Sequence, residues 1–491
     1  MTDHPKNEPS SALGGIASRL RRGGIWVFLG RSMGMGTVFA ITVLLAKNLN
    51  DASFANYVVT ASLVTLTGMM AMFGLNYLMC RMIAAAFASD GEVDPKQIAL
   101  RIGVTSFVTI SAIGGVFFFI SKFIFNLMGA EALIPHVPAI TCWIVLLSLS
   151  QIVAETFRGL HHLFAASLLA GVSGGLLANF IFLSTIVYLI WNEQLQLDSI
   201  MIAGPSSFVA PILLSSIWLI FAWPKAKLQK WTEKLERKNS KPDKPGGGQL
   251  HPQSFRGLAV LKEAFPIMLL NLSAYGIDQS GQLLAKSFGE DIHVNSFEAV
   301  WKLGFLIVVP LTMLGLASAS TISEQYSKNN LQVLQNVLRS VSTISLLLSL
   351  PLFLLLVFAG GPILGIVFQP SFAIGAGSLA ILASVQMVRN WMGPCDVILV
   401  MTGHQWWALA CFLVALPVLA IGPFAINQFG VLGITAVVAA ALLISRIGQY
   451  LVVRRKIGIL PQANLAPVFI TRLFRFTTNF RTPPLSNNET G

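Results

Sequence analysis

The feature that most constrains this chain is a succession of long apolar segments that recurs along almost its whole length. An α-helix needs about 20 apolar residues to cross the hydrocarbon core of a bilayer. Only 11% of the residues are charged, whereas about a quarter are charged in an ordinary soluble protein. We therefore predict an all-α, polytopic membrane protein. The predicted spans are residues 24–46, 55–79, 98–120, 134–157, 163–190, 200–222, 260–285, 294–318, 334–358, 374–400, 406–426 and 430–453.

Two details of this count stay open. Residues 120–134 and 360–374 are apolar enough to be either helix ends or further spans, so the total of twelve could rise to about 13 or 14. The first apolar segment is too long for a cleavable signal peptide and has no small-residue cleavage pattern. We expect it to remain as a membrane anchor.

The basic residues are distributed unevenly between the loops on the two sides. With the N-terminus in the cytoplasm, about 25 Lys and Arg residues lie on the cytoplasmic side, which is a strong positive-inside bias. The opposite loops hold only Lys47, Lys122 and Lys286. This predicts an inner-membrane protein with both termini in the cytoplasm. The net charge of +12 is then explained by orientation and anionic lipid headgroups, and no nucleic-acid partner is required.

The chain divides into five predicted parts. The central linker contains PDKPGGG, a composition typical of flexible connections. The last segment mixes aromatic residues with arginines, so it either lies on the membrane interface or is disordered. The parts are a cytoplasmic tail (1–23), a first six-helix half (24–222), a basic cytoplasmic linker (223–258), a second six-helix half (259–453) and a basic cytoplasmic tail (454–491).

A short repeat suggests that the two halves are duplicates. The tetrapeptide LLAK at residues 44–47 recurs at 283–286, an offset of 283 − 44 = 239 residues. At nearly the same offset, the next predicted helices run out into polar turns, FASDG (87–91) and YSKNN (326–330). Duplicated halves in transporters place the substrate between them, near the middle of the bilayer.

Three stretches resemble a known family in the same order and at similar spacing. They are LLAKNLNDASFANYV (44–58), IDQSGQLLAKSFG (277–289) and NQFGVLGI (427–434). Together they resemble the polysaccharide or lipid-linked oligosaccharide flippases of the MOP superfamily, relatives of the MATE drug exporters. The resemblance covers about residues 24–453. Asn56 stands where the family usually has Gly, and the central linker is longer than expected, so the subfamily and the substrate stay open.

The resemblance implies a bacterial flippase rather than an enzyme. Its substrate would be a polyprenyl-pyrophosphate-linked oligosaccharide, carried outward for envelope polysaccharide or exopolysaccharide synthesis by alternating access. Implied partners are membrane lipids, a coupling ion (H⁺ or Na⁺), and a polysaccharide polymerase with its glycosyltransferases. The alternatives are a MATE-like cation-coupled multidrug exporter, a transporter of the major facilitator type and a membrane glycosyltransferase. A Walker A motif for ATP is absent from the sequence.

The seventh predicted span carries a polar stripe. Asn271, Tyr275, Asp278, Gln282 and Lys286 are spaced by 4, 3, 4 and 4 residues, so they fall within an arc of roughly 80° on a helix. Such a stripe either lines a cavity or is sealed against neighbouring helices. We predict that Asn271, Tyr275 and Gln282 bind substrate and that Asp278 is the ion-coupling carboxylate.

The tenth predicted span carries a second polar face. Gln386, Arg389 and Asp396 are predicted to bind substrate, and Gly393-Pro394 is predicted to bend the helix. Seven residues of helix separate Arg389 from Asp396 by about 10.5 Å along the axis. We therefore expect them not to pair with each other. A bend here is either part of a moving gate or a tolerated kink.

Three arginines lie near the cytoplasmic ends of predicted spans, namely Arg31, Arg101 and Arg446. Pointing inward, they would form a cationic mouth that suits a pyrophosphate, and we assign Arg31 to substrate binding. Otherwise they extend to the lipid headgroups. Glu298 and Lys302, four residues apart, are predicted to form a structural ion pair.

We predict no metal site and no cofactor. The cysteines Cys80, Cys142, Cys395 and Cys411 lie in or beside apolar segments, and the sequence contains no CxxC pair. Small buried hydrophobic side chains are the expected role for such cysteines. The sequence also shows no nucleophile–base arrangement, and so no catalytic residue is proposed.

Overall fold

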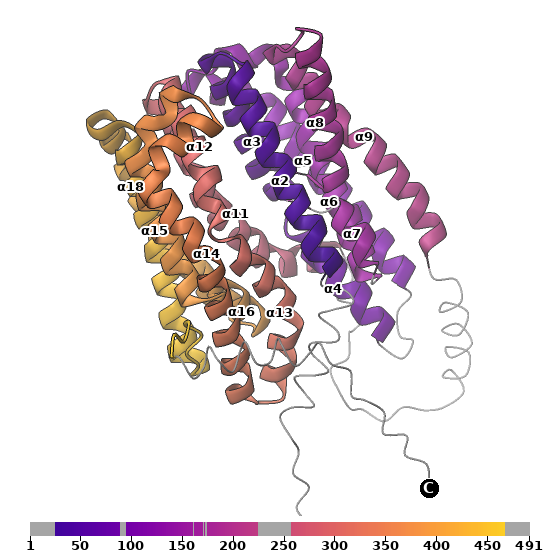
Figure 1. The fold of residues 1–491 in the computed structure, drawn as a ribbon. Coiled ribbons are helices and arrows are strands. Elements are labelled where there is room, and N and C mark those ends of the chain that lie inside the picture. Colours follow the sequence, from indigo (N-terminus) through magenta and orange to yellow (C-terminus); the bar gives the residue numbers. More distant parts are fainter. Residues whose placement is uncertain are drawn as a thin grey trace, which may run out of the picture.

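A computed structural model describes residues 25–88, 95–160, 162–169, 171, 174–223 and 257–466. Within these residues every regular element is a helix, which confirms the all-α prediction (Figure 1). The predicted N-terminal tail, nearly all of the basic linker and the end of the C-terminal tail lie outside the described residues.

Each predicted span before the linker corresponds to one helix or to two consecutive helices. The apolar segment near 120–134 adds no further span, because it forms the end of one helix and a short 3₁₀ helix. The elements are α2 (Ile25–Asn48), α3 (Asp51–Met72), α4 (Leu75–Ala88), α5 (Pro95–Leu127), η2 (Glu131–His136), α6 (Val137–Gly159), α7 (Leu163–Leu169), α8 (Leu176–Trp191) and α9 (Leu197–Ala222).

The spans after the linker correspond in the same way, and the segment near 360–374 is again a helix end followed by a 3₁₀ helix. The elements are α11 (Gly257–Phe288), α12 (Asp291–Leu306), α13 (Val309–Ser327), α14 (Leu331–Val367), η4 (Pro370–Gly375), α15 (Ala376–Met392), α16 (Cys395–Met401), α17 (Gln405–Ala415), η5 (Leu416–Ile421), α18 (Gly422–Val452) and the π-helical turn η6 (Val453–Ile457). Below, residues 25–222 are called the first half and residues 257–457 the second half.

Length and hydropathy identify the membrane-crossing helices. Among the described residues, eight helical stretches are long and apolar enough to cross a membrane, and α12 with α13, bent by 53°, makes a ninth. One of the eight, Gln405–Ile457, contains the last two predicted spans, and α8 is a shorter apolar helix. The chain is therefore a multi-pass membrane protein.

The order of elements repeats between the halves at the offset seen in the sequence. The 3₁₀ helices η2 and η4 begin 370 − 131 = 239 residues apart, and the helices that follow them begin 376 − 137 = 239 residues apart. The two LLAK segments end α2 and α11, the first helix of each half. In both halves the second span is broken, α3 from α4 and α12 from α13.

The break between α3 and α4 allows the halves to approach closely. Phe73 and Gly74 both have positive φ, 51° and 75°, and such a conformation favours glycine. A Cβ atom at Gly74 would lie 2.7 Å from the carbonyl oxygen of Ala264 on α11. Glycine at this position therefore permits both the turn and the contact between the halves.

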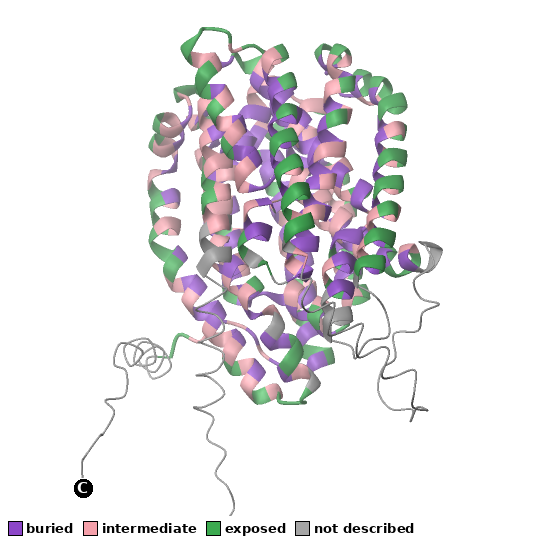
Figure 2. Cartoon of the chain, turned by 90° about the vertical axis from the view of Figure 1, so that its right-hand side faces the viewer, coloured by how far each residue is buried: buried purple, intermediate pink, exposed green. Residues whose placement is uncertain are grey.

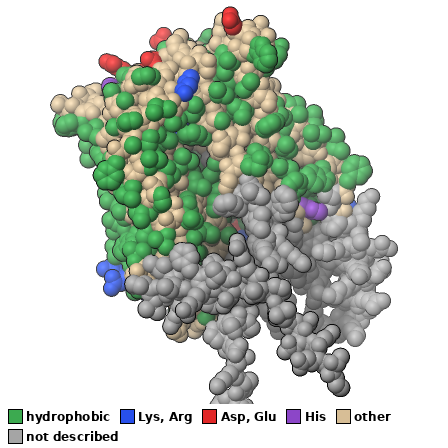
Figure 3. Space-filling view, viewed as in Figure 1, with side chains coloured by type: hydrophobic (Ala, Val, Ile, Leu, Met, Phe, Trp, Pro, Cys, Tyr) green, Lys and Arg blue, Asp and Glu red, His purple; other side chains and the backbone are tan. Residues whose placement is uncertain are grey.

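The two ends of the bundle differ in charge. We call the end where α2 begins and α9 ends the near end, and the opposite end, where α3 and α12 begin, the far end (Figure 1). Acidic side chains gather at the far end, at the top of Figure 3. The acidic residues in far-end loops and helix starts are Asp51, Glu131, Glu193, Asp198, Glu290 and Asp291.

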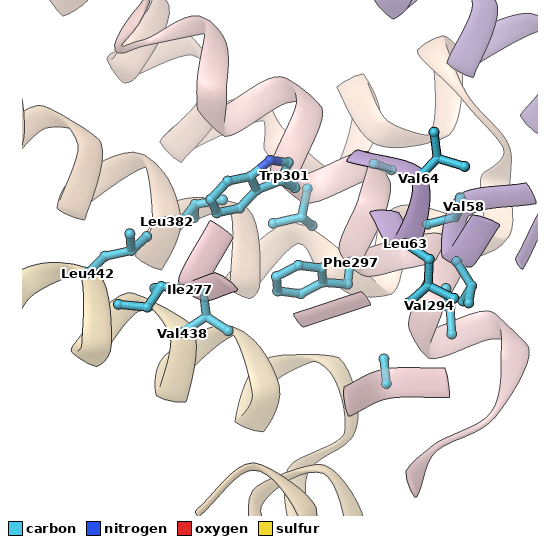
Figure 4. Close-up of a cluster of buried hydrophobic side chains, with 14 of the residues drawn as sticks. Val58, Leu63, Val64, Ile277, Val294, Phe297, Trp301, Leu382, Val438 and Leu442 are labelled. Atoms are coloured by element: carbon cyan, nitrogen blue, oxygen red, sulfur yellow. The ribbon is translucent and has the colours of Figure 1, made fainter. Parts of the chain in front are cut away.

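Burial follows the contacts between helices (Figure 2). Outward positions are exposed and often large and apolar, such as Phe119, Trp191 and Phe358, each more than 80% exposed. An outer surface of this kind faces lipid in a membrane protein. The apolar core continues from one half into the other, where α3 packs on α11 and α12. Figure 4 shows Val58 of α3 near Phe297 of α12 in this shared core.

Candidate functional site

Three charged side chains from three helices meet inside the second half. The Oδ2 atom of Asp396 on α16 accepts a hydrogen bond of 2.9 Å from Nη1 of Arg446 on α18. The same oxygen lies 3.5 Å from Nη2 of Arg389 near the end of α15. The other carboxylate oxygen of Asp396 accepts the backbone N–H of Val397 at 2.9 Å. One carboxylate thus serves two guanidinium groups.

The pairing of Arg389 with Asp396 corrects the expectation from helix geometry. That expectation was wrong because it assumed a continuous helix. Gly393 has φ +86° and ends α15, and the N–H of Cys395 bonds back to the carbonyl of Gly393. The predicted bend at Gly393-Pro394 is therefore present as a full break, and it brings Asp396 within reach of Arg389.

Arg446 lies in the interior of the second half. Only 10% of its side chain is exposed, and its guanidinium lies 5.4 Å from the ring centre of Phe412. It also donates to Oε1 of Gln449 at 3.1 Å, while its own Nε has no hydrogen-bond partner among the described residues. The predicted alternative, extension to lipid headgroups, does not describe this side chain. The sequence interpretation missed Gln449, although its i, i+3 spacing from Arg446 was a usable signal.

Asp278 is the fourth charged residue of this region. It lies about two-thirds of the way along α11, is half-buried, and interacts electrostatically with Arg389, Arg446 and Asp396. Among the described residues its carboxylate forms no hydrogen bond and no ion pair. Fully ionised, the four side chains carry two positive and two negative charges. Protonation of Asp278 would leave this charge cluster (Asp278, Arg389, Asp396 and Arg446) with a net charge of +1.

The polar stripe on α11 divides into two parts. Toward the far end its members are engaged: Gln282 is buried and donates to Glu298, and Lys286 forms an ion pair of 2.6 Å with Asp291. Toward the near end, Asn271 and Tyr275 are half-buried, like Asp278. The part of the stripe toward the far end therefore joins α11 to α12, whereas the part toward the near end is less buried.

The other predicted residues lie in different surroundings. Arg31 is on α2, but its side chain is outside the described part of the structure. Arg101 is exposed on α5, so it does not line the interior. Gln386 is buried on α15, about one turn before Arg389. The predicted Glu298–Lys302 ion pair is confirmed, with a distance of 3.1 Å.

The chain after α18 returns along the near end of the second half. We call residues 458–466 the C-terminal strap. Side chains of α14 hold it: Gln335 accepts from the N–H of Leu460 at 2.9 Å, and Ser342 donates to the carbonyl of Pro461 at 2.7 Å. The N–H of Ala463 donates to the carbonyl of Trp391 at 2.8 Å. The strap therefore supplies a donor to the last turn of α15, next to the break at Gly393.

Polar contacts connect the halves at the far end. Lys47 at the end of α2 donates to the carbonyl of Ile366 at 3.0 Å, and Gln369 donates to the carbonyl of Ala46. Asn295 of α12 donates to the carbonyl of Asp51 at 3.0 Å. Aromatic pairs add to this seal, with Phe39 against Phe368 and Phe54 against Phe372. We call this set of contacts the far-end interlock.

The part of α2 toward the near end is less covered by other helices than the part toward the far end. Met33 is 58% exposed, and a Cβ at Gly34 or Gly36 would meet no atom within 4 Å. The helix packs instead on α7 and α8 of its own half. Elsewhere at the near end the halves do touch, because Arg81 of α4 pairs with Glu263 of α11. Met33, Gly34 and Gly36 therefore lie where no other part of the described chain covers α2.

Comparison with known proteins identifies the fold. Residues 266–426 match the MatE family. An inward-facing multidrug-resistance MATE transporter of the MOP superfamily is similar over 93% of this chain and 99% of its own, with a TM-score of 0.64 and 14% identity. The chain therefore has the fold of MATE transporters and other MOP superfamily transporters, and its residues 266–426 match the MatE family.

Two other solved structures show the range of this fold. A MOP superfamily transporter from Pyrococcus furiosus, described as having a binding pocket of reversed polarity, matches with a TM-score of 0.59 and 13% identity, covering 90% of this chain and 96% of its own. The lipid II flippase MurJ in an inward closed conformation matches with a TM-score of 0.58 and 13% identity, covering 94% and 93%. No curated protein sequence matches the chain.

Proposed function

We propose that this MATE-like protein flips a polyprenyl-pyrophosphate-linked oligosaccharide across the bacterial inner membrane. The observation that carries the proposal is the shared carboxylate of Asp396. Two guanidiniums depend on it, and the contact of Arg389 is 3.5 Å, at the long limit of a hydrogen bond. The N–H groups of Arg389 can therefore donate hydrogen bonds to the oxygens of a diphosphate, and the planar guanidinium group matches the geometry of phosphate oxygens.

The uncovered surface of α2 at the near end supports a lipid as the substrate. A polyprenyl chain is far too apolar to enter a water-filled cavity, so it has to stay in the bilayer while the polar head passes through the protein. Exposed Met33 and the two open glycines, Gly34 and Gly36, leave such a path at the near end. The amide of Asn271 and the hydroxyl of Tyr275 lie on the half-buried part of the stripe on α11, where sugar hydroxyls would bind.

The proposed cycle is alternating access. The interlock closes the far end while the near end receives the substrate, and rocking of the halves then reverses which end is closed. Asp278 is the coupling residue of this cycle. When it binds a proton, the charge cluster gains one positive charge and attracts the diphosphate more strongly. Loss of the proton neutralises the cluster and favours release of the substrate.

The free carboxylate of Asp278 also supports a second candidate, a MATE-like exporter of organic cations. The two candidates predict opposite effects of pH on substrate binding. A cation would compete with the proton for Asp278, so its binding weakens as the pH falls. An anionic head would bind together with the proton, so its binding strengthens. Titrating both classes of ligand against the purified protein at several pH values distinguishes them.

Substitution of Arg389 tests the flippase function. We expect Arg389→Ala to slow flipping of a labelled polyprenyl-diphosphate oligosaccharide in proteoliposomes by about tenfold or more, because a hydrogen bond to a charged group contributes about 1.5–3 kcal/mol. Arg389→Lys should be intermediate, since it keeps the charge but loses the fork. Arg101→Ala removes an exposed arginine and is the matched control. A wild-type rate for Arg389→Ala would disprove the proposed site.

A further inference from the structure

A group of basic and aromatic side chains lies on the outer surface of the second half at the near end. Arg454, Arg455 and Lys456 follow one another in the π-helical turn η6, and all three are exposed. Nζ of Lys456 lies 4.8 Å from the ring centre of Trp407 at the start of α17. The neighbouring Trp406 is 55% exposed. We call these five residues the basic patch.

The three positive charges of the basic patch are not balanced by carboxylates. Among the described residues, Arg454, Arg455 and Lys456 form no ion pair. The acidic side chains near the helix ends at the near end each pair with a different basic residue, and they are Glu155, Glu263 and Glu324. The electrostatic field of the patch therefore favours an anion from outside the described chain.

The outer face of α18 is apolar between the basic patch and the middle of the helix. Ile444, Ile447 and Leu451 are each about 40% exposed and are spaced by 3 and 4 residues, so they form a line along one face. Arg454 continues this line three residues further on. An apolar line that ends in basic side chains matches a phospholipid, whose acyl chains lie in the hydrocarbon region and whose phosphate lies at its surface.

The π-helical turn explains why three consecutive basic residues all reach the surface. Its hydrogen bond from the N–H of Gly458 to the carbonyl of Val453 spans five residues, which makes a wider turn than that of an α-helix. Val453 and Ile457 on either side are buried and pack the turn against the second half. The backbone of the basic patch is therefore ordered before a ligand binds, which lowers the entropic cost of binding.

We propose that the basic patch binds the headgroup of an anionic phospholipid in the leaflet at the near end. The guanidinium groups of Arg454 and Arg455 donate to its phosphate oxygens, and the ammonium group of Lys456 adds a third positive charge. The indole rings of Trp406 and Trp407 lie at the level of the headgroups, as aromatic residues do at membrane interfaces. The acyl chains lie along the apolar line of α18.

This proposal predicts a preference for lipids with a net negative charge. A zwitterionic headgroup carries its own positive charge, so it compensates the three cations less well than an anionic headgroup does. The basic patch lies on the outer surface of the second half, outside the charge cluster around Asp396. The proposal therefore holds whatever substrate the protein carries, and it does not rest on the flippase function.

A phospholipid that cross-links on illumination tests the proposal. The probe is phosphatidylglycerol with a photoreactive group in one acyl chain, added at a low share to proteoliposomes of phosphatidylcholine. The same photoreactive chain on phosphatidylcholine is the comparison, and mass spectrometry identifies the labelled segments. We expect the anionic probe to label segments 401–414 and 444–456 about threefold more than the zwitterionic probe does. Around Phe119, on the exposed face of α5, the two probes should label equally.

Substitution of the basic residues locates the interaction. Combining Arg454→Gln, Arg455→Gln and Lys456→Gln should remove the preference for the anionic probe. Arg454→Lys with Arg455→Lys should keep most of it, because the charge remains. Arg101→Gln with Lys328→Gln removes two exposed basic residues elsewhere at the near end and is the matched control. Equal labelling by both probes in the wild type, or an unchanged preference in the triple Gln variant, would overturn the proposal.

Two measurements on the wild-type protein complete the test and do not depend on how the variants fold. Raising the NaCl concentration should reduce the preference for the anionic probe, because exposed charges are screened by salt. At equal ionic strength, inorganic phosphate should compete with the probe no better than chloride does. Specific competition by phosphate would mean that the basic patch takes a free anion, and this would contradict a lipid site. None of these results bears on the flipping assay for Arg389.

Discussion

At the scale of single residues, Asp278 and Asp396 show how position decides the role of a carboxylate. Asp396 accepts three hydrogen bonds, two of them from arginines, and it is a structural anion that holds α16 against α15 and α18. Asp278 lies within the electrostatic influence of the same arginines but forms no hydrogen bond among the described residues. Only the carboxylate of Asp278 can gain or lose a proton without breaking hydrogen bonds between helices.

This difference predicts the result of two substitutions at Asp278. Asp278→Asn keeps the size of the side chain but cannot titrate, so we expect normal abundance and loss of gradient-dependent transport. Asp278→Ala should also be abundant, because it breaks no contact. If Asp278 instead braced helices, Asn would work nearly as well and Ala would lower the protein level. Transport with and without an imposed pH gradient, together with the amount of protein in the membrane, separates these outcomes.

At the scale of helices, the apolar segments were predictable because a spanning helix must satisfy its backbone within itself. The bend at Gly393-Pro394 was predictable for a similar local reason, since proline removes a backbone donor. The consequences of that bend were not predictable. The ion pair of Arg389 with Asp396 depends on the direction in which α16 leaves the break. The strap that supports the break follows it in the sequence only after two further spans.

Alanine at Gly393 tests this support. Gly393 has φ +86°, and a Cβ there would lie 2.4 Å from Oγ of Ser342 and 3.0 Å from the carbonyl oxygen of Pro461 in the strap. Gly403 has φ +79° and open space around it, so Gly403→Ala measures the backbone cost alone, about 1–2 kcal/mol. We expect Gly393→Ala to lower the midpoint of thermal unfolding in detergent clearly more than Gly403→Ala does. Equal effects would mean that the strap adapts to the methyl group.

At the scale of the whole molecule, the asymmetry of charge along the bundle is the main argument for its orientation. The acidic residues of the described loops gather at the far end, whereas Arg81, Arg158 and Arg454 lie at the near end. The duplicated order of elements makes the two halves similar in shape, so charge rather than shape has to direct insertion. Clusters of Lys and Arg beside a span resist translocation, and acidic residues contribute little to this effect.

This argument predicts that the near end faces the cytoplasm and that the interlocked far end faces the periplasm. A reporter active only in the cytoplasm should give a signal when it is inserted at Gly247 in the basic linker or fused after Arg455. A reporter active only in the periplasm should give a signal in the far-end loop after Trp191, which is 86% exposed. Because the three sites probe both sides, reversed insertion exchanges all the signals. In that case the interlock would lie on the cytoplasmic side, and the substrate would have to enter from the opposite side.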